Sequence, residues 1–461
     1  MVKNFLAILL LVSMVPKANA QEDSLNNERS KKPNIELGLR SYFMSTGYWQ
    51  DFKGDHAWGQ SAFLRVKTQS FHGFSLTASY AVFGKILSSD LSAREPRTGA
   101  TNRYEIGLFD VLDAGNNFFG KVEDLHLTFQ SKKLTANVGR MGINTPFINP
   151  QDGRLEPTFV EGLRLNYKPN SRLQFGGDLI WRMSPRSTSG WFRIGETIGV
   201  YPIGRNEFGA PSAYFGNTFS DFVSVTDLRY RLPEEASLQL NHTLVQNISS
   251  TYLAEFQKEW KAKVWKNSII SGFQGVVQHG IGEGGNQDPA LRYKNPEDIN
   301  YIWGARIGLK NDKMVLHLNY TSIKGSGRFL SPREWGKDPF FTFIPRERNE
   351  GFSKVDALTL FIQRSFPERS LQLSSHVGLH FLPSPTNFLI NKYAFPSYAQ
   401  MNLAAKYAPK NWGKGLDFHL ILMTKKALDQ SGLQPGWIYN KVNLLHLDMI
   451  LNYRIQWNEQ K

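Results

Sequence analysis

Residues 139–167 read GRMGINTPFINPQDGRLEPTFVEGLRLNY. This stretch begins at the end of one segment in which apolar and polar side chains alternate, runs through an irregular connection and finishes in a second such segment. The connection contains three prolines, Pro146, Pro150 and Pro157. Prolines at this density exclude both a helix interior and a fully paired central strand. The connection also carries apolar side chains such as Phe147, which favour packing over a freely moving loop. A long irregular loop that can pack is usually a functional one.

The alternation on either side of this loop recurs along the whole chain. Segments of about ten residues with a period of two are typical of the strands of a transmembrane β-barrel. In the segment 74–83, for example, Phe74 and Leu76 share one face, and Ser75 and Thr77 share the other. We predict eighteen such strands, near residues 35–44, 58–68, 74–83, 122–130, 133–140, 159–167, 173–182, 221–230, 237–246, 251–260, 269–278, 300–309, 314–321, 355–364, 372–381, 398–408, 416–423 and 446–457.

The lengths of the connections favour a membrane barrel over a water-soluble β-sandwich, which would show the same alternation. Short connections, such as residues 131–132 and 311–312, take turns with long ones, such as 84–121 and 322–354. Tight turns at one rim and long external loops at the other produce this rhythm. The connection 247–250 is an exception, because it is short where a long loop is expected.

Aromatic residues lie at or near the ends of several predicted strands. Amphipathic rings at these positions are typical of the girdles that a barrel places at the two membrane interfaces. Ordinary packing at the edge of a sheet is the alternative interpretation. The residues are Trp181, Tyr230, Trp260, Tyr320, Tyr407 and Trp457.

The N-terminus has the features of a secretory signal peptide. Lys3 precedes an apolar run from Phe5 to Val12, and Ala18-Asn19-Ala20 is a cleavage site of the A-x-A type. We therefore predict a signal peptide at 1–20, a short periplasmic lead at 21–34 and a single barrel domain at 35–461. This organisation predicts the outer membrane of a double-membraned bacterium as the location.

Composition limits the chemistry that is available. The chain contains no cysteine, which excludes disulfides, thiolate metal sites and cysteine nucleophiles. Its formal net charge is +14. In an exported protein this charge favours a field for anionic solutes or anionic lipid headgroups rather than nucleic acid. A surface of scattered, solvated charges is the alternative interpretation.

The chain resembles the OprD family of outer-membrane porins in its eighteen predicted strands and its constricting third external loop. The sequence resemblance is strongest at Gly139-Arg140, Thr145-Pro146, Asp152-Gly153-Arg154-Leu155, Pro157 and Phe159 to Gly162. It implies a narrow, substrate-selective diffusion channel for small water-soluble solutes, often carboxylates or amino acids. It also implies basic residues along one wall of the pore.

We expect the third loop to fold into the barrel mouth and set the pore radius, without any catalysed reaction. The residues expected at the constriction are Arg140, Pro146, Phe147, Asp152, Arg154 and Glu156. The basic residues expected to point into the lumen are Arg65, Lys67, Arg164, Arg182, Arg229, Arg306, Lys406 and Arg454. Guanidinium groups suit carboxylates and phosphates, so we expect a modest preference for anions. The alternative is that these cations pair with acidic residues across neighbouring strands.

Other functions have weaker support. The chain lacks the G-x-S-x-G pattern of many hydrolases, and His376 and His380 would stand too far apart on a strand to share a metal ion. The run 340–343, FFTF, could plug, gate or simply pack a long loop. We predict a porin without cofactor or metal, in contact with outer-membrane lipids, and a homotrimer is an open alternative to a monomer. A plugged surface-binding barrel is the alternative, followed by an outer-membrane hydrolase.

Overall fold

The computed structural model describes residues 33–461 except 114, 151–153, 202, 262–266 and 458–461. The predicted signal peptide and all but the last two residues of the predicted lead therefore lie outside the described residues. In the part of the chain that is described, no helix combines the length and the hydrophobicity needed to cross a membrane.

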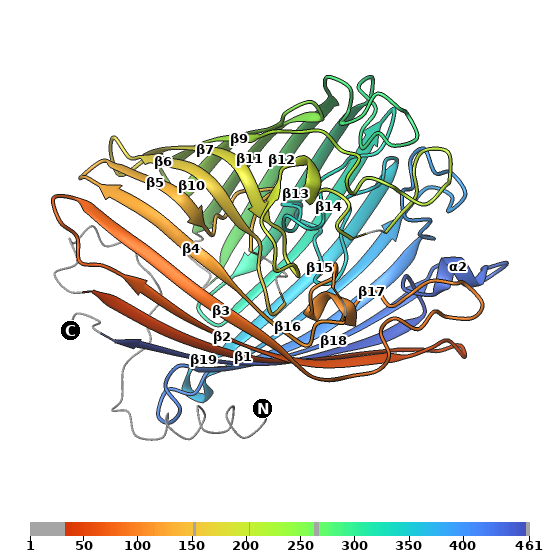
Figure 1. Ribbon diagram of the computed structural model, residues 1–461, viewed down its shortest axis with the longest axis horizontal. Coiled ribbons are helices and arrows are strands. Elements are labelled where there is room, and N and C mark those ends of the chain that lie inside the picture. The colour runs from red at the N-terminus through yellow and green to blue at the C-terminus, as the bar shows by residue number, and fades with distance from the viewer. Residues whose placement is uncertain (1–32, 114, 151–153, 202, 262–266, 458–461) are drawn as a thin grey trace.

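The chain forms one antiparallel sheet that closes on itself. β19 pairs with β1 along its whole length, so that eighteen long strands form a continuous wall (Figure 1). The two-residue strand β8 (Phe192–Arg193) pairs only with the end of β7. The wall strands are β1 (Asn34–Tyr48), β2 (Asp55–Lys67), β3 (Phe74–Ser88), β4 (Phe118–Gln130), β5 (Leu134–Met141), β6 (Phe159–Tyr167), β7 (Leu173–Ser184), β9 (Val223–Leu232), β10 (Ala236–Val245), β11 (Ser249–Lys261), β12 (Ser268–Gly280), β13 (Ile299–Lys310), β14 (Met314–Gly325), β15 (Val355–Phe366), β16 (Leu371–Phe381), β17 (Tyr398–Tyr407), β18 (Leu416–Ala427) and β19 (Leu444–Trp457).

Each predicted strand overlaps a strand of the wall, and the predicted fold class is confirmed. The connection after β10, residues 246–248, is short where the alternation of short and long connections predicts a long loop. It joins β10 to β11 at the same end of the barrel as the long loops. Residues 49–54, between β1 and β2, form a second short connection at that end. We call this end the mouth, and we call the end with the tight turns the base.

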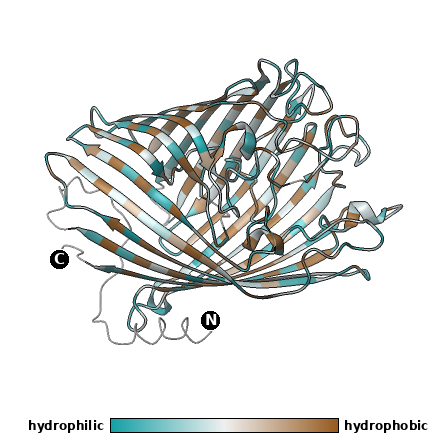
Figure 2. Ribbon diagram, in the orientation of Figure 1, coloured by the Kyte–Doolittle hydropathy of each residue, from teal (hydrophilic) through white to brown (hydrophobic). Residues whose placement is uncertain are grey.

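Hydrophobic and hydrophilic residues alternate along the wall strands (Figure 2). The exposure of their side chains separates an apolar outer face from a more polar lumen face. On β3, Phe74 is 47% exposed and Tyr80 is 53% exposed, whereas Ser75 and Thr77 between them are each 6% exposed. The outer apolar side chains are largely exposed, and an apolar outer surface is what a barrel wall presents to lipid. The prediction of which residues of 74–83 share a face is therefore confirmed.

Several of the long loops fold into the barrel, and three of them matter most here. These three are the second loop (89–117), the third loop (142–158) and the seventh loop (326–354), and their chain runs between the walls in Figure 1. Phe147 of the third loop packs in one buried cluster with Phe329 and Phe340 of the seventh loop. Tyr104 and Leu108 of the second loop pack against wall residues in another cluster. The core of the protein therefore lies inside the mouth.

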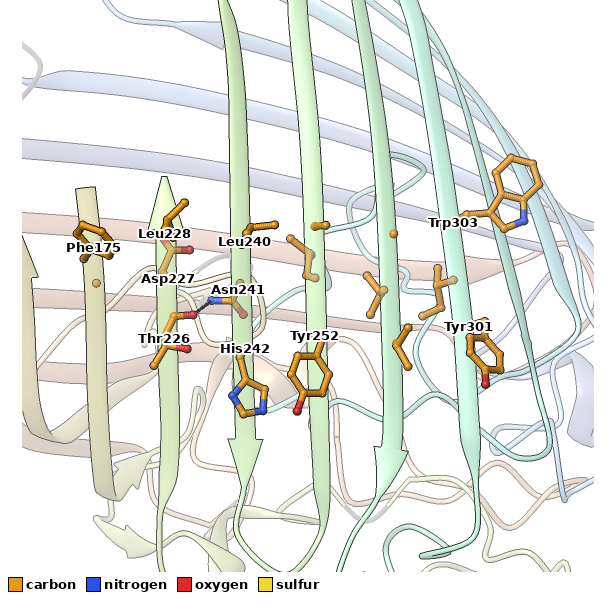
Figure 3. Close-up of a pocket in the computed structure, with 17 residues that line it drawn as sticks. Phe175, Thr226, Asp227, Leu228, Leu240, Asn241, His242, Tyr252, Tyr301 and Trp303 are labelled. Carbon is orange, nitrogen blue, oxygen red and sulfur yellow. Dashed lines mark hydrogen bonds between the residues drawn. The ribbon is translucent and has the colours of Figure 1, made fainter. Parts of the chain in front are cut away.

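One cavity lies on the outer face and is not part of the lumen. This groove of about 800 Å³ runs across β7 and β9 to β13 (Figure 3). Its apolar side chains Leu240, Tyr252 and Trp303 are exposed on the outer face, whereas Leu253 and Val276, which point to the lumen, are buried. The groove therefore faces the surroundings of the wall and offers no path through it.

Gly139 of β5 offers a test of the backbone geometry at the start of the third loop. Its φ of 122° is unfavourable for residues with a Cβ, and an added Cβ would lie 2.2 Å from the carbonyl oxygen of Leu125. We expect Gly139→Ala to destabilise the barrel by about 1–3 kcal/mol. The urea midpoint of the refolded barrel in lipid vesicles measures this effect.

Gly177→Ala on β7 is the matched control, because no heavy atom lies within 4 Å of its added Cβ. Equal urea midpoints for the two variants would contradict the assigned backbone geometry at Gly139.

Candidate functional site

The seventh loop crosses the lumen and is held by the wall on two sides. On β12, the side-chain amide of Gln274 donates to the carbonyl oxygen of Pro339 at 2.9 Å and accepts from the backbone N–H of Phe341 at 3.1 Å. On β17, the side-chain amides of Gln400 and Asn402 both donate to the carbonyl oxygen of Pro345 at 3.0 Å. The loop therefore spans the space between these two parts of the wall.

The third loop is attached to the seventh loop inside the mouth. The backbone N–H of Asn149 donates to the carbonyl oxygen of Trp335 at 3.0 Å, and the side-chain oxygen of Asn149 accepts from the N–H of Lys337 at 3.0 Å. The Thr158 hydroxyl donates to the carbonyl oxygen of Glu334 at 2.7 Å. These hydrogen bonds make the two loops one packed unit, so that a movement of one disturbs the other.

A buried group of charged side chains lies at the centre of this unit, and we call it the ionic cluster. Its members are Arg103 of the second loop, Arg333, Glu347 and Glu350 of the seventh loop, Lys392 of the loop 382–397, and Lys425 of β18.

Glu347 links three cations from three parts of the chain. Its carboxylate lies 3.1 Å from Arg103, 3.1 Å from Arg333 and 2.7 Å from Lys425. Burial alone would raise the pKa of Glu347, but Arg103, Lys425 and Arg333 outweigh that effect and hold this pKa well below its usual range. Glu347 is therefore ionised at neutral pH and neutralises the cations around it.

Glu350 forms the second half of the ionic cluster. It lies 2.9 Å from Arg333 and 3.5 Å from Lys392, and it accepts a hydrogen bond from the Tyr393 hydroxyl at 2.7 Å. The cluster holds four cations against two carboxylates, which leaves it with an excess of positive charge. Glu334, which is also buried nearby, offsets part of this excess.

Another buried ion pair ties the seventh loop to β19. Arg346 donates to Asp448 of β19 at 2.8 Å, and Asp448 also accepts from the Tyr42 hydroxyl of β1 at 3.3 Å. Asp448 lies 3.2 Å from His446 on the same strand. All four side chains are buried, so losing one partner would leave an unpaired polar group away from water.

Solvent reaches the lumen residues near the base more than those near the mouth. The side chains of Lys406 and Arg229, near the base, are 52% and 50% exposed. The side chain of Lys425, near the mouth, is 0% exposed. The loops therefore fill the half of the lumen at the mouth, and the half at the base stays solvated.

The residues expected at the constriction lie in three different environments. Pro146 and Phe147 belong to the inward third loop, and Phe147 is buried against the seventh loop. Arg154 and Glu156 also belong to this loop, but both are buried in packing and do not line an opening. Glu156 forms an ion pair with Lys121 of β4.

Arg40 of β1, on the lumen side of the wall, donates to the carbonyl oxygen of Arg154, which places this part of the third loop against β1. Asp152 lies outside the described residues.

The prediction that Arg140 faces the opening is wrong. On β5 the outward residue Val138 is exposed, and Arg140 stands two positions further along on the same face. There Arg140 forms an ion pair with Glu161 of β6 at 2.9 Å and lies over the ring of Trp191. The inward fold of the loop begins only after β5 ends at Met141.

Most of the basic residues expected in the lumen do point inward, and several are neutralised by acids. Arg65 pairs with Glu36 and Asp124, each at 3.0 Å. The other pairs are Arg164 with Asp178 at 3.7 Å, Arg229 with Asp227 at 2.8 Å, and Lys406 with Asp417 at 3.1 Å. These four residues therefore form ion pairs with acids on the same or another strand, and they do not form a row of unpaired cations.

Three of the remaining residues form no ion pair with an acid in the described part of the chain. Arg306 donates to the side chain of Asn319 at 2.7 Å and lies over the ring of Phe341 in the seventh loop. Lys67 and Arg454 form no ion pair with any described residue.

The prediction that Arg182 points inward is wrong. A β-bulge lies in β7, where Glu161 of β6 faces Arg182 but the next residue, Gly162, faces Ile180. Ile180 and Met183 are both buried, so Trp181 and Arg182 between them lie on the outer side. Strict alternation along the strand assigns Arg182 to the lumen face. It cannot anticipate a bulge, and the bulge turns Arg182 to the outer face.

Sequence reasoning did not identify the ionic cluster. Its residues come from loops far apart in sequence, and no spacing pattern connects them. The one available signal was the density of charged and aromatic residues in the seventh loop, PREWGKDPFFTFIPRERNE at 332–350. The aromatic run 340–343 does pack: Phe340 and Phe341 are buried inside the barrel.

Glu347→Gln tests the contribution of the ionic cluster to loop packing. Removing one partner of a buried ion pair costs about 3–5 kcal/mol, because the remaining charges are left uncompensated. A cysteine introduced at Thr342, a fully buried position in the seventh loop, would be the only thiol in the chain. We expect Glu347→Gln to make this thiol react roughly tenfold faster or more with a water-soluble reagent.

Glu368→Gln in the same background is the matched control, because Glu368 is exposed in a turn at the base. Unchanged thiol reactivity in a folded Glu347→Gln barrel would show that the ionic cluster does not hold the seventh loop in place.

Comparisons with known proteins agree with the fold. The chain matches no protein-family model and no curated protein sequence. Its structure is similar to that of Pseudomonas aeruginosa OccK9 (OpdG), with a TM-score of 0.71, 13% identity, and coverage of 93% of this chain and 100% of that one. For Acinetobacter baumannii OccAB4 the TM-score is 0.71, with 15% identity and coverage of 94% and 100%.

A third similar structure is Pseudomonas aeruginosa OpdK with vanillate, with a TM-score of 0.69, 13% identity, and coverage of 93% and 100%. These proteins are outer-membrane porins of the OprD family. The resemblance to that family is therefore confirmed at the level of the fold.

Proposed function

We propose that this chain, whose barrel matches those of the OprD-family porins, is a passive outer-membrane channel for small water-soluble solutes. The observation that carries the proposal is the inward fold of the third and seventh loops, joined to each other and fixed to the wall by Gln274, Gln400 and Asn402. Loops packed inside a barrel restrict passage to solutes that fit between them. The solute gradient supplies the driving force, and the proposal involves no catalysed reaction.

The solvated half of the lumen at the base gives solutes free access up to the packed loops. The packed loops fill the half at the mouth and the seventh loop crosses it, so we infer that passage depends on movement of the seventh loop. Its attachment through buried ion pairs, such as Arg346 with Asp448 at 2.8 Å, supports two discrete states, closed and open, rather than a continuously variable opening.

The charges inside favour small anions, including amino-acid-like solutes with a carboxylate. The ionic cluster has four cations for two carboxylates. Arg306 and Arg454 on the wall form no ion pair with an acid among the described residues. A positive field along a narrow path raises the local concentration of anions. The predicted modest anion preference therefore rests on these residues rather than on Arg65, Arg164, Arg229 and Lys406.

A plugged surface-binding barrel is the second candidate, and one observation favours it. The side chains of the ionic cluster are almost fully buried, which is the state expected of a closed mouth. Conductance separates the two candidates, because a plugged barrel passes no ions.

The remaining parts of the proposal concern the surroundings of the barrel. The outer-membrane neighbours support the same location for this chain, and the apolar outer face supports contact with lipid. We retain the signal peptide at residues 1–20 and assembly into trimers as proposals.

The first test measures single-channel conductance of the refolded chain in a planar bilayer. We expect small discrete steps from the natural sequence, and steps several times larger when residues 337–349 are replaced by a short Gly-Ser linker. Deleting 142–149 of the third loop should raise conductance less, because the seventh loop keeps its own attachments to β12 and β17. The reversal potential in a salt gradient gives the sign of the preferred ion.

The matched control deletes the exposed residues 429–432 of the last loop and should leave conductance unchanged. If the natural sequence gave no steps and only the linker variant conducted, the plugged barrel would replace the channel.

The second test uses the pH dependence of Asp338 in the seventh loop. Burial raises the pKa of Asp338 to about 6, against the opposing effect of Arg348. A raised carboxyl pKa means that the packed loop holds this proton more tightly than the released loop does. Packing therefore weakens as pH rises from about 4 to about 6, by an amount on the order of 2 kcal/mol.

We expect channel openings to be roughly tenfold more frequent at pH 7 than at pH 4.5, a tenfold change being about 1.4 kcal/mol. Asp338→Asn should remove most of this difference, because an amide carries no charge to bury. A pH profile identical in the variant and the natural sequence would exclude Asp338 as its cause.

A further inference from the structure

Four charged residues stand side by side on the outer face near the mouth, and we call them the outer charged row. Arg140 of β5 faces Glu161 of β6, Glu161 faces Arg182 of β7, and Arg182 faces Arg193 of β8. Residues directly opposite each other on antiparallel strands share a face and have Cβ atoms about 5 Å apart. The pairing therefore places the four side chains at one level on neighbouring strands.

The bulge in β7 decides that this row faces outward. Ile180 and Met183 are 1% and 0% exposed, and Trp181 between them is 38% exposed. The indole N–H of Trp181 donates to Glu161 at 3.1 Å, so Trp181 and Glu161 share the outer face. Without the bulge, Arg182 would point into the lumen.

The charges of the row are only partly balanced. Glu161 is engaged by Arg140 at 2.9 Å and by Trp181, and it also interacts electrostatically with Arg182. Neither Arg182 nor Arg193 forms an ion pair with a described residue, and both are exposed.

The other acid nearby is Glu196, whose carboxylate accepts from the backbone N–H of Arg193 at 3.0 Å. Two cations directly opposite each other on paired strands destabilise that pairing. A bound anion between Arg182 and Arg193 would remove this repulsion.

The position of the row indicates where that anion comes from. One step toward the base on the same face, Val138, Leu163 and Leu179 are exposed and apolar. These residues belong to the band that faces hydrocarbon, and exposed tryptophans such as Trp181 are typical of its boundary. Arg182 and Arg193 therefore lie at the height of lipid headgroups, with an apolar surface for acyl chains directly below.

We propose that Arg182 and Arg193 bind the phosphate group of a phosphorylated lipid in the outer leaflet. Guanidinium groups make bidentate, charge-assisted hydrogen bonds to phosphate, and a phosphate carries enough negative charge to neutralise both arginines. The lipid's acyl chains lie against Leu163 and Leu179. The Arg140–Glu161 ion pair borders the site on the side of Arg182 that faces away from Arg193. This proposal rests on the membrane location proposed above, but not on whether the lumen conducts.

The test measures lipid binding to the full refolded chain in detergent by native mass spectrometry. The probe is an acylated glucosamine disaccharide with two phosphates, and it is compared with the same lipid without phosphates and with inorganic phosphate. We expect Arg182→Gln combined with Arg193→Gln to weaken binding of the phosphorylated lipid roughly tenfold or more. Arg182→Lys combined with Arg193→Lys keeps both charges but loses the bidentate geometry. Its affinity for the phosphorylated lipid should lie between those of the natural sequence and the double glutamine variant.

Lys324→Gln is the matched control. Lys324 lies on β14 near the mouth on the outer face, opposite Tyr301, and its charge is already paired with Asp356 at 2.9 Å. Binding of the phosphorylated lipid should be unchanged in this variant. Equal losses in both variants would mean that any cation at this rim attracts the lipid and would overturn the assigned site.

Two further results would overturn the proposal. Equal binding of the phosphorylated and phosphate-free lipids would show that phosphate is not recognised. Binding of inorganic phosphate that depends on Arg182 and Arg193, without any effect of these residues on lipid binding, would assign the site to a soluble anion. Because the readout is lipid binding, it is independent of the conductance experiments.

Discussion

The hydrogen bonds between β1 and β19 are the interaction on which the rest of the structure depends. A sheet edge in hydrocarbon would leave backbone N–H and C=O groups without partners, at a cost of several kcal/mol for each group. Pairing from Ile35 with Trp457 to Tyr48 with Leu444 removes the edges. Closure then requires the side chains to alternate, because one face of each strand meets the surroundings and the other meets the lumen.

Closure also creates an interior whose half at the mouth is filled by protein. Polar groups in that half need partners, since burial without a hydrogen bond is costly. The seventh loop provides many of them, through the carbonyl oxygens of Pro339 and Pro345 and the carboxylate of Glu347. The same contacts that satisfy the wall residues fix the position of the loop. The polar contacts between the wall and the seventh loop therefore both pack the mouth and restrict the lumen.

Local departures from regular strand geometry assign individual charges to the two faces. The bulge in β7 turns Arg182 outward and creates the outer charged row. In β4, a second bulge brings the neighbouring residues Glu123 and Asp124 both to the buried side, where Asp124 pairs with Arg65. A shift of one residue exchanges the faces of all following side chains, so these bulges determine which charges reach the lumen.

The sequence by itself determined the strands, their number, the closed barrel and the inward third loop, because period-two alternation and proline-rich connections are local properties. Arg65, Arg164 and Arg229 lie on the lumen side, as regular alternation around them predicts, and their role in a pore stays a prediction. The sequence did not determine the partners of those arginines, the outward orientation of Arg140 and Arg182, or the assembly of Arg103, Arg333, Glu347 and Lys425 in one cluster. Only the tertiary structure decided these, because ion pairs depend on strand register and on loops that meet across the lumen, and neither leaves a periodic signal in the chain.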